Sequence, residues 1–124
     1  MSGASVSHAD GLGVGSKHDG DTIAVTFSGV AELPAVGRLG EFLRALHVDA
    51  VDSHVKEVVA DFNHLEFMNS SCFKMFVSWI ISIQDQPADK QYRVRIRQNE
   101  QILWQRRSMH ALQGLAPELI ELEH

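Results

Sequence analysis

The chain has 124 residues, of which 44% are hydrophobic and 22% are charged, and its formal net charge is −5. This length and composition predict a single globular domain with one hydrophobic core. Non-specific nucleic-acid binding depends on cationic surfaces, so the negative net charge argues against it as the main role of the chain.

The expected compartment is the cytoplasm. A single cysteine excludes an internal disulfide, which fits a reducing environment. The longest apolar run, from Phe73 to Ile83, is too short to span a bilayer. The N-terminus lacks the basic region and apolar block of a secretory signal. We therefore expect no contact with a membrane, and none with nucleic acid.

The two ends of the chain differ in composition from its middle. Residues 1–20 are rich in Gly, Ser, His and Asp and predict a flexible segment; the alternative is a loose first strand around Ser5–His8 or Leu12–Lys17. The last three residues, Leu122–His124, resemble the start of a purification tag and are left out of the predicted domain. The domain is therefore expected to span residues 21–121.

Strand and helix patterns alternate in the first half of this domain. Thr22 to Val30 alternates between apolar and polar residues, as a half-buried strand does. Val36 to Ala50 has apolar residues at helical spacing and predicts an amphipathic helix. A buried strand is expected at Val58–Phe62, followed by a helix from Ser70 to about Gln84.

The second half continues this alternation. Gln91 to Gln98 predicts a strand with one buried face, and Glu118 to Glu121 is a candidate for a short closing strand. Between them a helix is expected from Glu100 to Leu112, ended by Gly114. Its expected core contacts are Ile102, Leu103, Met109 and Leu112. The whole pattern predicts an α/β sandwich with a mixed sheet of four or five strands and helices mainly on one face.

The helix after Ser70 is apolar around most of its circumference, because its polar residues form one narrow stripe at Lys74, Ser78 and Ser82. Such a helix needs cover on more than one side. The sheet and a neighbouring helix could supply this cover. The alternative is that a partner or a second copy of the chain covers residues such as Met75 and Trp79.

The strand at Gln91–Gln98 places Arg93, Arg95 and Arg97 on one face. One interpretation is a solvated sheet face or a charged edge that prevents aggregation. The other is a cationic patch that binds an acidic partner.

The turn between the buried strand and the apolar helix carries the main functional signal. Asn69 is the expected N-cap of this helix. Ser70 and Ser71 follow it, next to the free N–H groups of the first helical turn. A phosphoryl group is well received at such a place, because the helix N-terminus carries partial positive charge.

The segment Leu65–Cys72, with the sequence LEFMNSSC, resembles the signature of STAS domains, the fold of anti-sigma factor antagonists. In that family the strand ends in a segment like L-x-F-M-D-S-S-G, and its first serine is phosphorylated. The resemblance places the phosphorylation site on Ser70, with Ser71 as a secondary site. It extends more weakly from Thr22 to Glu121, where Met109–Leu115 is similar to the family's helix ending in Gly-Leu.

The resemblance implies a STAS-like fold and a regulatory function without catalysis. The implied partners are an anti-sigma-type serine kinase and a PP2C-like phosphatase, with a homodimer as a further possibility. The residues expected to contact the partner surround the serines: Asn69, Ser70, Ser71, Cys72, Lys74 and Met75.

Two residues depart from the family pattern. Asn69 replaces an aspartate, which keeps the cap but removes a negative charge beside the serine. Cys72 replaces a glycine and adds a side chain where the family offers bare backbone to a partner. These departures favour the alternative function, a STAS-like module that no longer switches and acts as a scaffold or as a sensor of a small ligand.

Other site chemistry has little support in the sequence. His64 is the only local base for Ser70 or Ser71, and no G-x-S-x-G motif accompanies it, so hydrolase chemistry is not expected. Cys72 is expected to be a core thiol rather than a reactive one. Metal-ligand spacing is absent from the central histidines, and no glycine-rich phosphate loop is present, so neither a metal nor a cofactor is expected. These histidines are His47, His54, His64 and His110.

Overall fold

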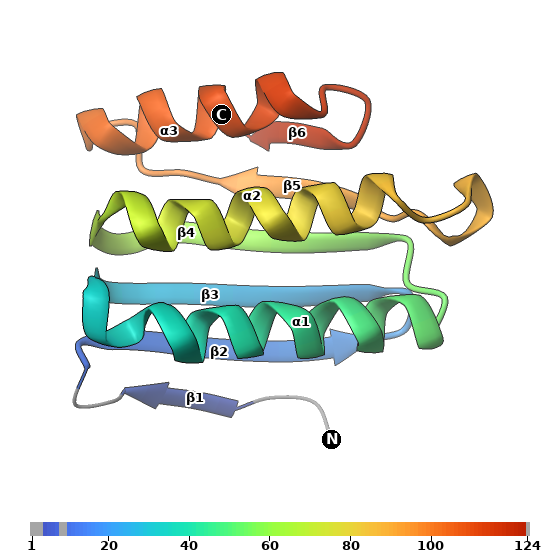
Figure 1. The fold of residues 1–124 in the computed structure, drawn as a ribbon, viewed down its shortest axis with the longest axis horizontal. Coiled ribbons are helices and arrows are strands. Elements are labelled where there is room, and N and C mark those ends of the chain that lie inside the picture. The colour runs from blue at the N-terminus through green and yellow to red at the C-terminus, as the bar shows by residue number, and fades with distance from the viewer. Residues whose placement is uncertain (1–3, 8–9, 124) are drawn as a thin grey trace.

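The computed structural model describes residues 4–7 and 10–123. Within these residues one sheet contains six strands in the order β1-β2-β3-β4-β5-β6, which is also their order along the chain. The pairings β1–β2 and β2–β3 are antiparallel, and those from β3 to β6 are parallel. In order, the strands span Ala4–Ser7, Leu12–Asp19, Thr22–Ala31, Glu57–Met68, Arg93–Arg97 and Ile120–Glu123 (Figure 1).

Each parallel strand is joined to the next by a helix. These helices are α1 (Val36–Asp52), α2 (Ser70–Gln84) and α3 (Leu103–Leu115), and all three lie on the same face of the sheet (Figure 1). Short 3₁₀ turns, η1 (Leu33–Ala35) and η2 (Ala88–Lys90), lie in the connections. The predicted sandwich with a mixed sheet and helices on one face is confirmed, with one strand more than the largest number expected.

The additional sheet area comes from the N-terminal residues. β2 pairs with β3 along its whole length, and Leu12 and Val14 are buried under α1 and its neighbours in the core. The prediction of a flexible segment was therefore wrong for Leu12–Asp19, and the alternative of a first strand describes them. Their Gly- and Ser-rich composition hides the short apolar segment that anchors the strand.

The C-terminal residues also belong to the fold. Leu122 is 7% exposed and lies opposite Ile96 in the β5–β6 pairing, and Glu123 ends the strand. It was therefore wrong to leave these two residues out of the domain. His124 lies outside the described residues.

The core lies between the sheet and the helices, with three phenylalanines at its centre. Phe27 of β3 stacks on Phe62 of β4 at 5.1 Å between ring centroids. Phe76 of α2 meets both rings edge-on, at 5.1 and 5.3 Å. Edge-to-face contacts of this kind add to the gain from burying apolar area.

Most of the apolar surface of α2 is covered within the chain, as the first of the two interpretations expects. Its buried residues, Cys72, Phe76, Trp79, Ile80 and Ile83, face the sheet and the flanking helices. Trp79 is 4% exposed, so it needs no partner to cover it. Ile81 remains 47% exposed on the outer side of the helix.

A chain of hydrogen bonds joins α2, the start of β5 and α1. The Trp79 Nε1–H donates to the Tyr92 hydroxyl oxygen at 2.8 Å, and this hydroxyl lies 2.8 Å from Nδ1 of His47. Because the tyrosine oxygen accepts from Trp79, its own proton is available to His47 Nδ1. This arrangement favours the neutral imidazole with its proton on Nε2.

The pKa of His47 is lowered by burial. In the unfolded chain a histidine titrates at about pH 6.5, whereas His47 in the folded protein takes up its proton only at lower pH. Between these two values the unfolded state binds more protons, so the free energy of unfolding falls as the pH falls through this window.

His47→Asn keeps an acceptor near the position of Nδ1 but cannot be protonated. We expect this variant to lose less free energy of unfolding than the wild type between about pH 7 and pH 5. Urea unfolding at each pH measures the difference, and the other histidines are common to both proteins. Identical pH profiles would contradict the assignment.

Two glutamines are buried, and their surroundings differ. Gln105 of α3 is fully buried; its Nε2 donates to the carbonyls of Phe62 and Leu65 at 2.6 and 2.8 Å, and its Oε1 accepts from Asn99 N at 2.8 Å. The pairing of β4 with β5 ends at Asp61, so beyond that point Gln105 takes the place of the next strand. By contrast, Oε1 of Gln98 is buried without a donor among the described residues.

Gln105 also explains why the core prediction for α3 was only partly right. Met109 and Leu112 are buried as expected. Because Gln105 occupies the inward position one turn before Met109, Leu103 points outward and is 56% exposed. Ile102 is half-buried and precedes the helix as its N-cap.

The two glutamines give a matched pair of substitutions. Gln105→Leu leaves two carbonyls and one N–H without partners, and we expect it to lower the free energy of unfolding by about 3 kcal/mol or more. Gln98→Leu removes an oxygen that has no donor, and we expect a change within about 1 kcal/mol or a gain. Urea unfolding of both variants tests this difference, and equal losses would contradict it.

Candidate functional site

The turn between β4 and α2 lies at the carboxyl edge of the sheet, the edge at which the parallel strands β3 to β6 end (Figure 1). Asn69 is the N-cap of α2, as predicted: its Oδ1 accepts from the backbone N–H of Cys72 at 2.8 Å. Its own backbone N–H donates to the carbonyl of Ala31 at 2.9 Å. Asn69 therefore fixes the start of α2 to the end of β3.

The two serines follow the cap. Ser70 is the first residue of α2 and is exposed, and Ser71 is half-buried. Among the described residues, none forms a hydrogen bond with either hydroxyl. The structure thus presents the Ser70 hydroxyl to solvent beside the N–H groups of the first helical turn.

Cys72 lies on the inner side of the same turn. It is fully buried, and its thiol lies 3.5 Å from the carbonyl oxygen of Glu32. Burial raises the pKa of the Cys72 thiol, and the negative charge of Asp10 adds to this effect. The expected core thiol is confirmed. Its inclusion among the partner contacts was wrong, because the side chain points into the core and leaves the outer surface unchanged.

Lys74 and Met75 lie one turn further along α2. Lys74 is exposed. Met75 is half-buried and packs toward α1, where a Cβ added to Gly40 would lie 3.1 Å from its sulfur. Of the expected contact residues, Asn69, the serines and Lys74 are thus together at the carboxyl edge, whereas Met75 serves mainly in helix packing.

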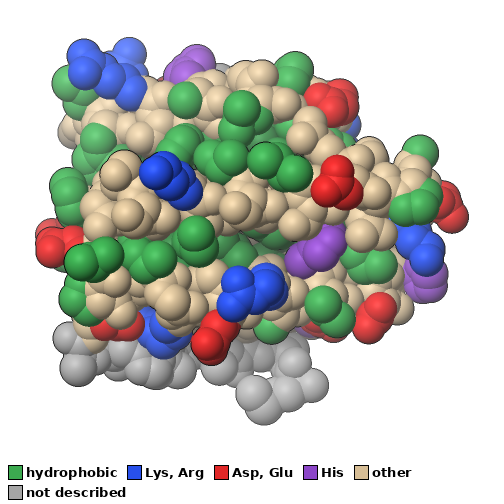
Figure 2. All heavy atoms as spheres, in the orientation of Figure 1, with side chains coloured by type: hydrophobic (Ala, Val, Ile, Leu, Met, Phe, Trp, Pro, Cys, Tyr) green, Lys and Arg blue, Asp and Glu red, His purple; other side chains and the backbone are tan. Residues whose placement is uncertain are grey.

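Three exposed hydrophobic side chains belong to the segments that form this edge. Leu33 follows β3 and is 71% exposed, Phe67 lies at the end of β4 and is 46% exposed, and Leu103 begins α3 and is 56% exposed. The Trp104 Nε1–H donates to the carbonyl of Glu66 at 2.8 Å, which ties the start of α3 to the residue before Phe67. Figure 2 shows hydrophobic side chains along the end of the molecule where α2 begins.

An apolar edge of this kind is typical of a protein-docking surface. The sequence did not predict Leu33, Phe67 or Leu103 as site residues. Leu33 and Phe67 lie in or next to connections, where no periodicity predicts exposure. Leu103 was assigned to the core. The LEFM motif, which contains Phe67, was the one available signal.

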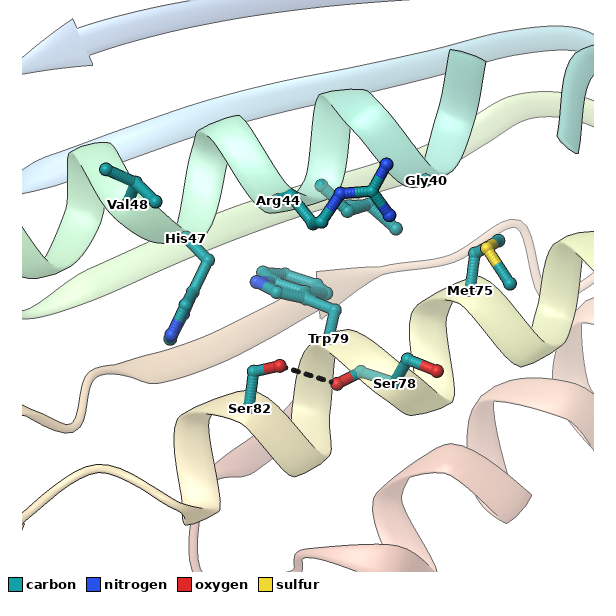
Figure 3. A pocket seen from close by; sticks show the side chains of 9 residues that line it. Gly40, Arg44, His47, Val48, Met75, Ser78, Trp79 and Ser82 are labelled. Atoms are coloured by element: carbon teal, nitrogen blue, oxygen red, sulfur yellow. Dashed lines mark hydrogen bonds between the residues drawn. The ribbon is translucent and has the colours of Figure 1, made fainter. Parts of the chain in front are cut away.

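A groove between α1 and α2 is the candidate site for a small ligand (Figure 3). Arg44 and His47 line it from α1, Ser78 and Ser82 from α2, and Trp79 lies at its base. Its volume is about 200 Å³, below the range of about 300–1,000 Å³ for ligand pockets. This gives the small-ligand alternative little support.

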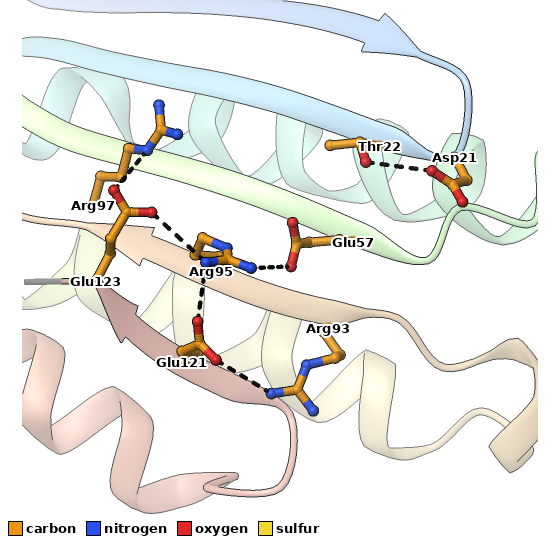
Figure 4. A network of polar contacts seen from close by, with 8 residues as sticks. All are labelled: Asp21, Thr22, Glu57, Arg93, Arg95, Arg97, Glu121 and Glu123. Carbon is orange, nitrogen blue, oxygen red and sulfur yellow. Dashed lines mark hydrogen bonds and ion pairs between the residues drawn. The ribbon is translucent and has the colours of Figure 1, made fainter.

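The arginines of β5 lie on the sheet face that the helices leave open. Arg95 pairs with Glu57 of β4 at 3.2 Å and with Glu121 of β6 at 3.1 Å. Arg97 pairs with Glu123 at 3.1 Å and Arg93 with Glu121 at 3.8 Å (Figure 4). The interpretation as a cationic patch was therefore wrong, because glutamates of the neighbouring strands neutralise the arginines. The other interpretation, a solvated sheet face, fits the structure.

The other chemistry considered from the sequence has no support at this site. His64 is exposed on β4, and no hydrogen bond joins it to Ser70 or Ser71. Within residues 4–7 and 10–123, no three His, Cys, Asp or Glu side chains are grouped so as to hold a metal ion. In the same residues no helix has the length and apolar character needed to cross a membrane.

Comparisons with known proteins identify the fold. No protein-family model matches the chain, and no curated protein matches its sequence. Among solved structures, the chain is similar to an anti-sigma factor antagonist from Mycobacterium paratuberculosis, with a TM-score of 0.66 and 18% identity over 94% of this chain and 89% of the other. It is also similar to the anti-sigma factor antagonist SpoIIAA in its unphosphorylated form, with a TM-score of 0.62 and 14% identity over 90% and 88% of the two chains. The predicted STAS-like fold is confirmed.

The cap of α2 is testable by substitution. Asn69→Ala removes the acceptor of the Cys72 N–H, and we expect it to lower the free energy of unfolding by about 1 kcal/mol. Asn69→Asp keeps an equivalent acceptor and should stay close to the wild type. Thermal melting of both variants checks this difference. An unchanged melting temperature in Asn69→Ala would contradict the role of the cap.

Proposed function

We propose that this protein is a regulatory interaction module that acts like an anti-sigma factor antagonist and is switched by phosphorylation of Ser70. The observation that carries the proposal is the exposed Ser70 hydroxyl, which has no partner among the described residues and lies at a capped helix N-terminus. Exposed hydrophobic side chains belong to the same edge.

The surroundings of Ser70 suit a phosphate. The free N–H groups of the first turn of α2 attract negative charge. Lys74 follows Ser70 by four residues, the spacing at which helical side chains are neighbours, and it is exposed. Asn69 is neutral, so no carboxylate at the cap repels a phosphate. Phosphorylation is therefore expected to change the surface of the module while leaving its fold intact.

The added charge would act on docking. A phosphoserine carries about −1.5 to −2 charges near pH 7. A partner that covers Leu33, Phe67 and Leu103 would have to remove water from this charge, which opposes binding. Phosphorylation is thus expected to release the partner, and dephosphorylation to restore binding.

The partner in this proposal is an anti-sigma-type serine kinase in the cytoplasm, with a PP2C-like phosphatase acting in the opposite direction. The kinase supplies the nucleotide and the base for the reaction, so the module needs no catalytic group of its own. The similarity to two anti-sigma factor antagonists, one of them solved in its unphosphorylated form, supports this assignment. A second copy of the chain could use the same edge as a homodimer.

The test is to incubate the purified protein with ATP and each anti-sigma-type serine kinase of its source organism, and to map the products by mass spectrometry. We expect phosphate mainly on Ser70, with Ser71 as a minor site. Ser70→Ala should bind the kinase without release, and Ser70→Asp should bind more weakly than wild type, since a carboxylate only partly imitates phosphate. Ser78→Ala, at an exposed serine further along α2, is the matched control.

The opposite result has a definite meaning. If neither Ser70 nor Ser71 is phosphorylated, and if kinase binding is indifferent to substitution of both, the switch is excluded and the non-switching scaffold remains. Light scattering of the unmodified protein shows whether the chain forms a homodimer.

A further inference from the structure

The outer face of α3 carries an unbalanced positive charge. Leu103, Arg106, Arg107 and His110 are all exposed and follow one another at the spacing of a single helical face. We call these four residues the basic face of α3. They line a wide, open depression on the surface. The helix sequence, LWQRRSMHALQGL, contains no acidic residue.

The basic face differs from most other arginines of the chain; Arg44 of α1 also has no carboxylate partner among the described residues, but it stands alone beside the groove between α1 and α2. Arg38 forms an ion pair with Asp10 at 2.8 Å, and the three arginines of β5 are paired with glutamates. Neither Arg106 nor Arg107 has a carboxylate partner among the described residues. Two exposed guanidinium groups are therefore left without an internal counter-charge in a chain whose net charge is −5, and an external anion could pair with them.

We infer that the basic face of α3 binds an acidic segment of a protein partner. Guanidinium groups bind carboxylates through paired hydrogen bonds, and the exposed Leu103 offers an apolar contact beside them. A peptide can supply carboxylates and an apolar side chain together, whereas a free phosphate supplies charge alone. Extended polyanions such as DNA or an anionic bilayer would also face the acidic remainder of the chain, whereas a short acidic segment can meet the basic face alone.

The basic face is continuous with the carboxyl edge. It begins at Leu103, and the next residue, Trp104, is tied to the carbonyl of Glu66 beside Phe67. A partner that covers Ser70 can therefore extend along α3 without leaving the protein surface. That the acidic segment belongs to the same partner rests on the proposed function; the binding of an acidic peptide does not.

The test uses a blocked peptide of four glutamates around one leucine, titrated into isotopically labelled protein and followed by NMR. We expect saturable shifts at the amides of Leu103 to His110 that weaken as salt increases. The double variant Arg106→Glu and Arg107→Glu should weaken binding by about tenfold or more. The double variant Lys17→Glu and Lys90→Glu changes the net charge equally at exposed sites elsewhere and should bind like the wild type.

The inference would be overturned by equal losses in the two double variants, by equal binding of a glutamine analogue of the peptide, or by shifts confined to other surfaces. Tighter binding of inorganic phosphate or of single-stranded DNA to the same residues would also overturn it, in favour of another anion. Peptide binding is expected to be the same in Ser70→Ala and Ser70→Asp. The peptide titration therefore tests this inference independently of whether Ser70 is phosphorylated.

Discussion

The hydrogen bonds of Gln105 hold together the part of the molecule on which the site depends. Beyond Asp61, β4 has no strand partner on the β5 side, and its carbonyls at Phe62 and Leu65 are bound by this one side chain instead. An unpaired backbone group in the core is costly, so loss of Gln105 would destabilise this end of β4 on the side away from β3. Ser70 follows five residues after Leu65, and its position depends on this end of β4, which pairing with β3 and the Asn69–Ala31 hydrogen bond hold from the other side.

The polar groups of the fold divide into those paired within the chain and those left for solvent or a partner. The sheet face is balanced, because arginines of β5 alternate with glutamates of the strands on either side (Figure 4). At the carboxyl edge the Ser70 hydroxyl has no hydrogen-bond partner among the described residues. On the outer face of α3 the guanidinium groups of Arg106 and Arg107 have no carboxylate partner among them. Two different kinds of surface, apolar and cationic, meet at the start of α3.

Local patterns in the sequence were sufficient to predict the Asn69 cap, the exposed Ser70 and the alternating order of strands and helices, because each depends on residues close together along the chain. Features set by distant residues were not predictable. The pairing of Arg95 with Glu57 requires the register of two parallel strands. Leu103 faces outward because Gln105 turns inward to bind the free carbonyls of β4. These carbonyls are free only because the pairing of β4 with β5 ends at Asp61, which the sequence does not show.

The two tryptophans of the chain occupy different environments, so intrinsic fluorescence can report on both. Trp79 is 4% exposed in the core, so its emission follows global unfolding. Trp104 is half-buried at the carboxyl edge, with its indole N–H donating to the Glu66 carbonyl, so its emission is sensitive to water at the proposed docking surface. With each indole replaced in turn by phenylalanine, intrinsic fluorescence separates loss of the fold from arrival of a partner, without any attached dye.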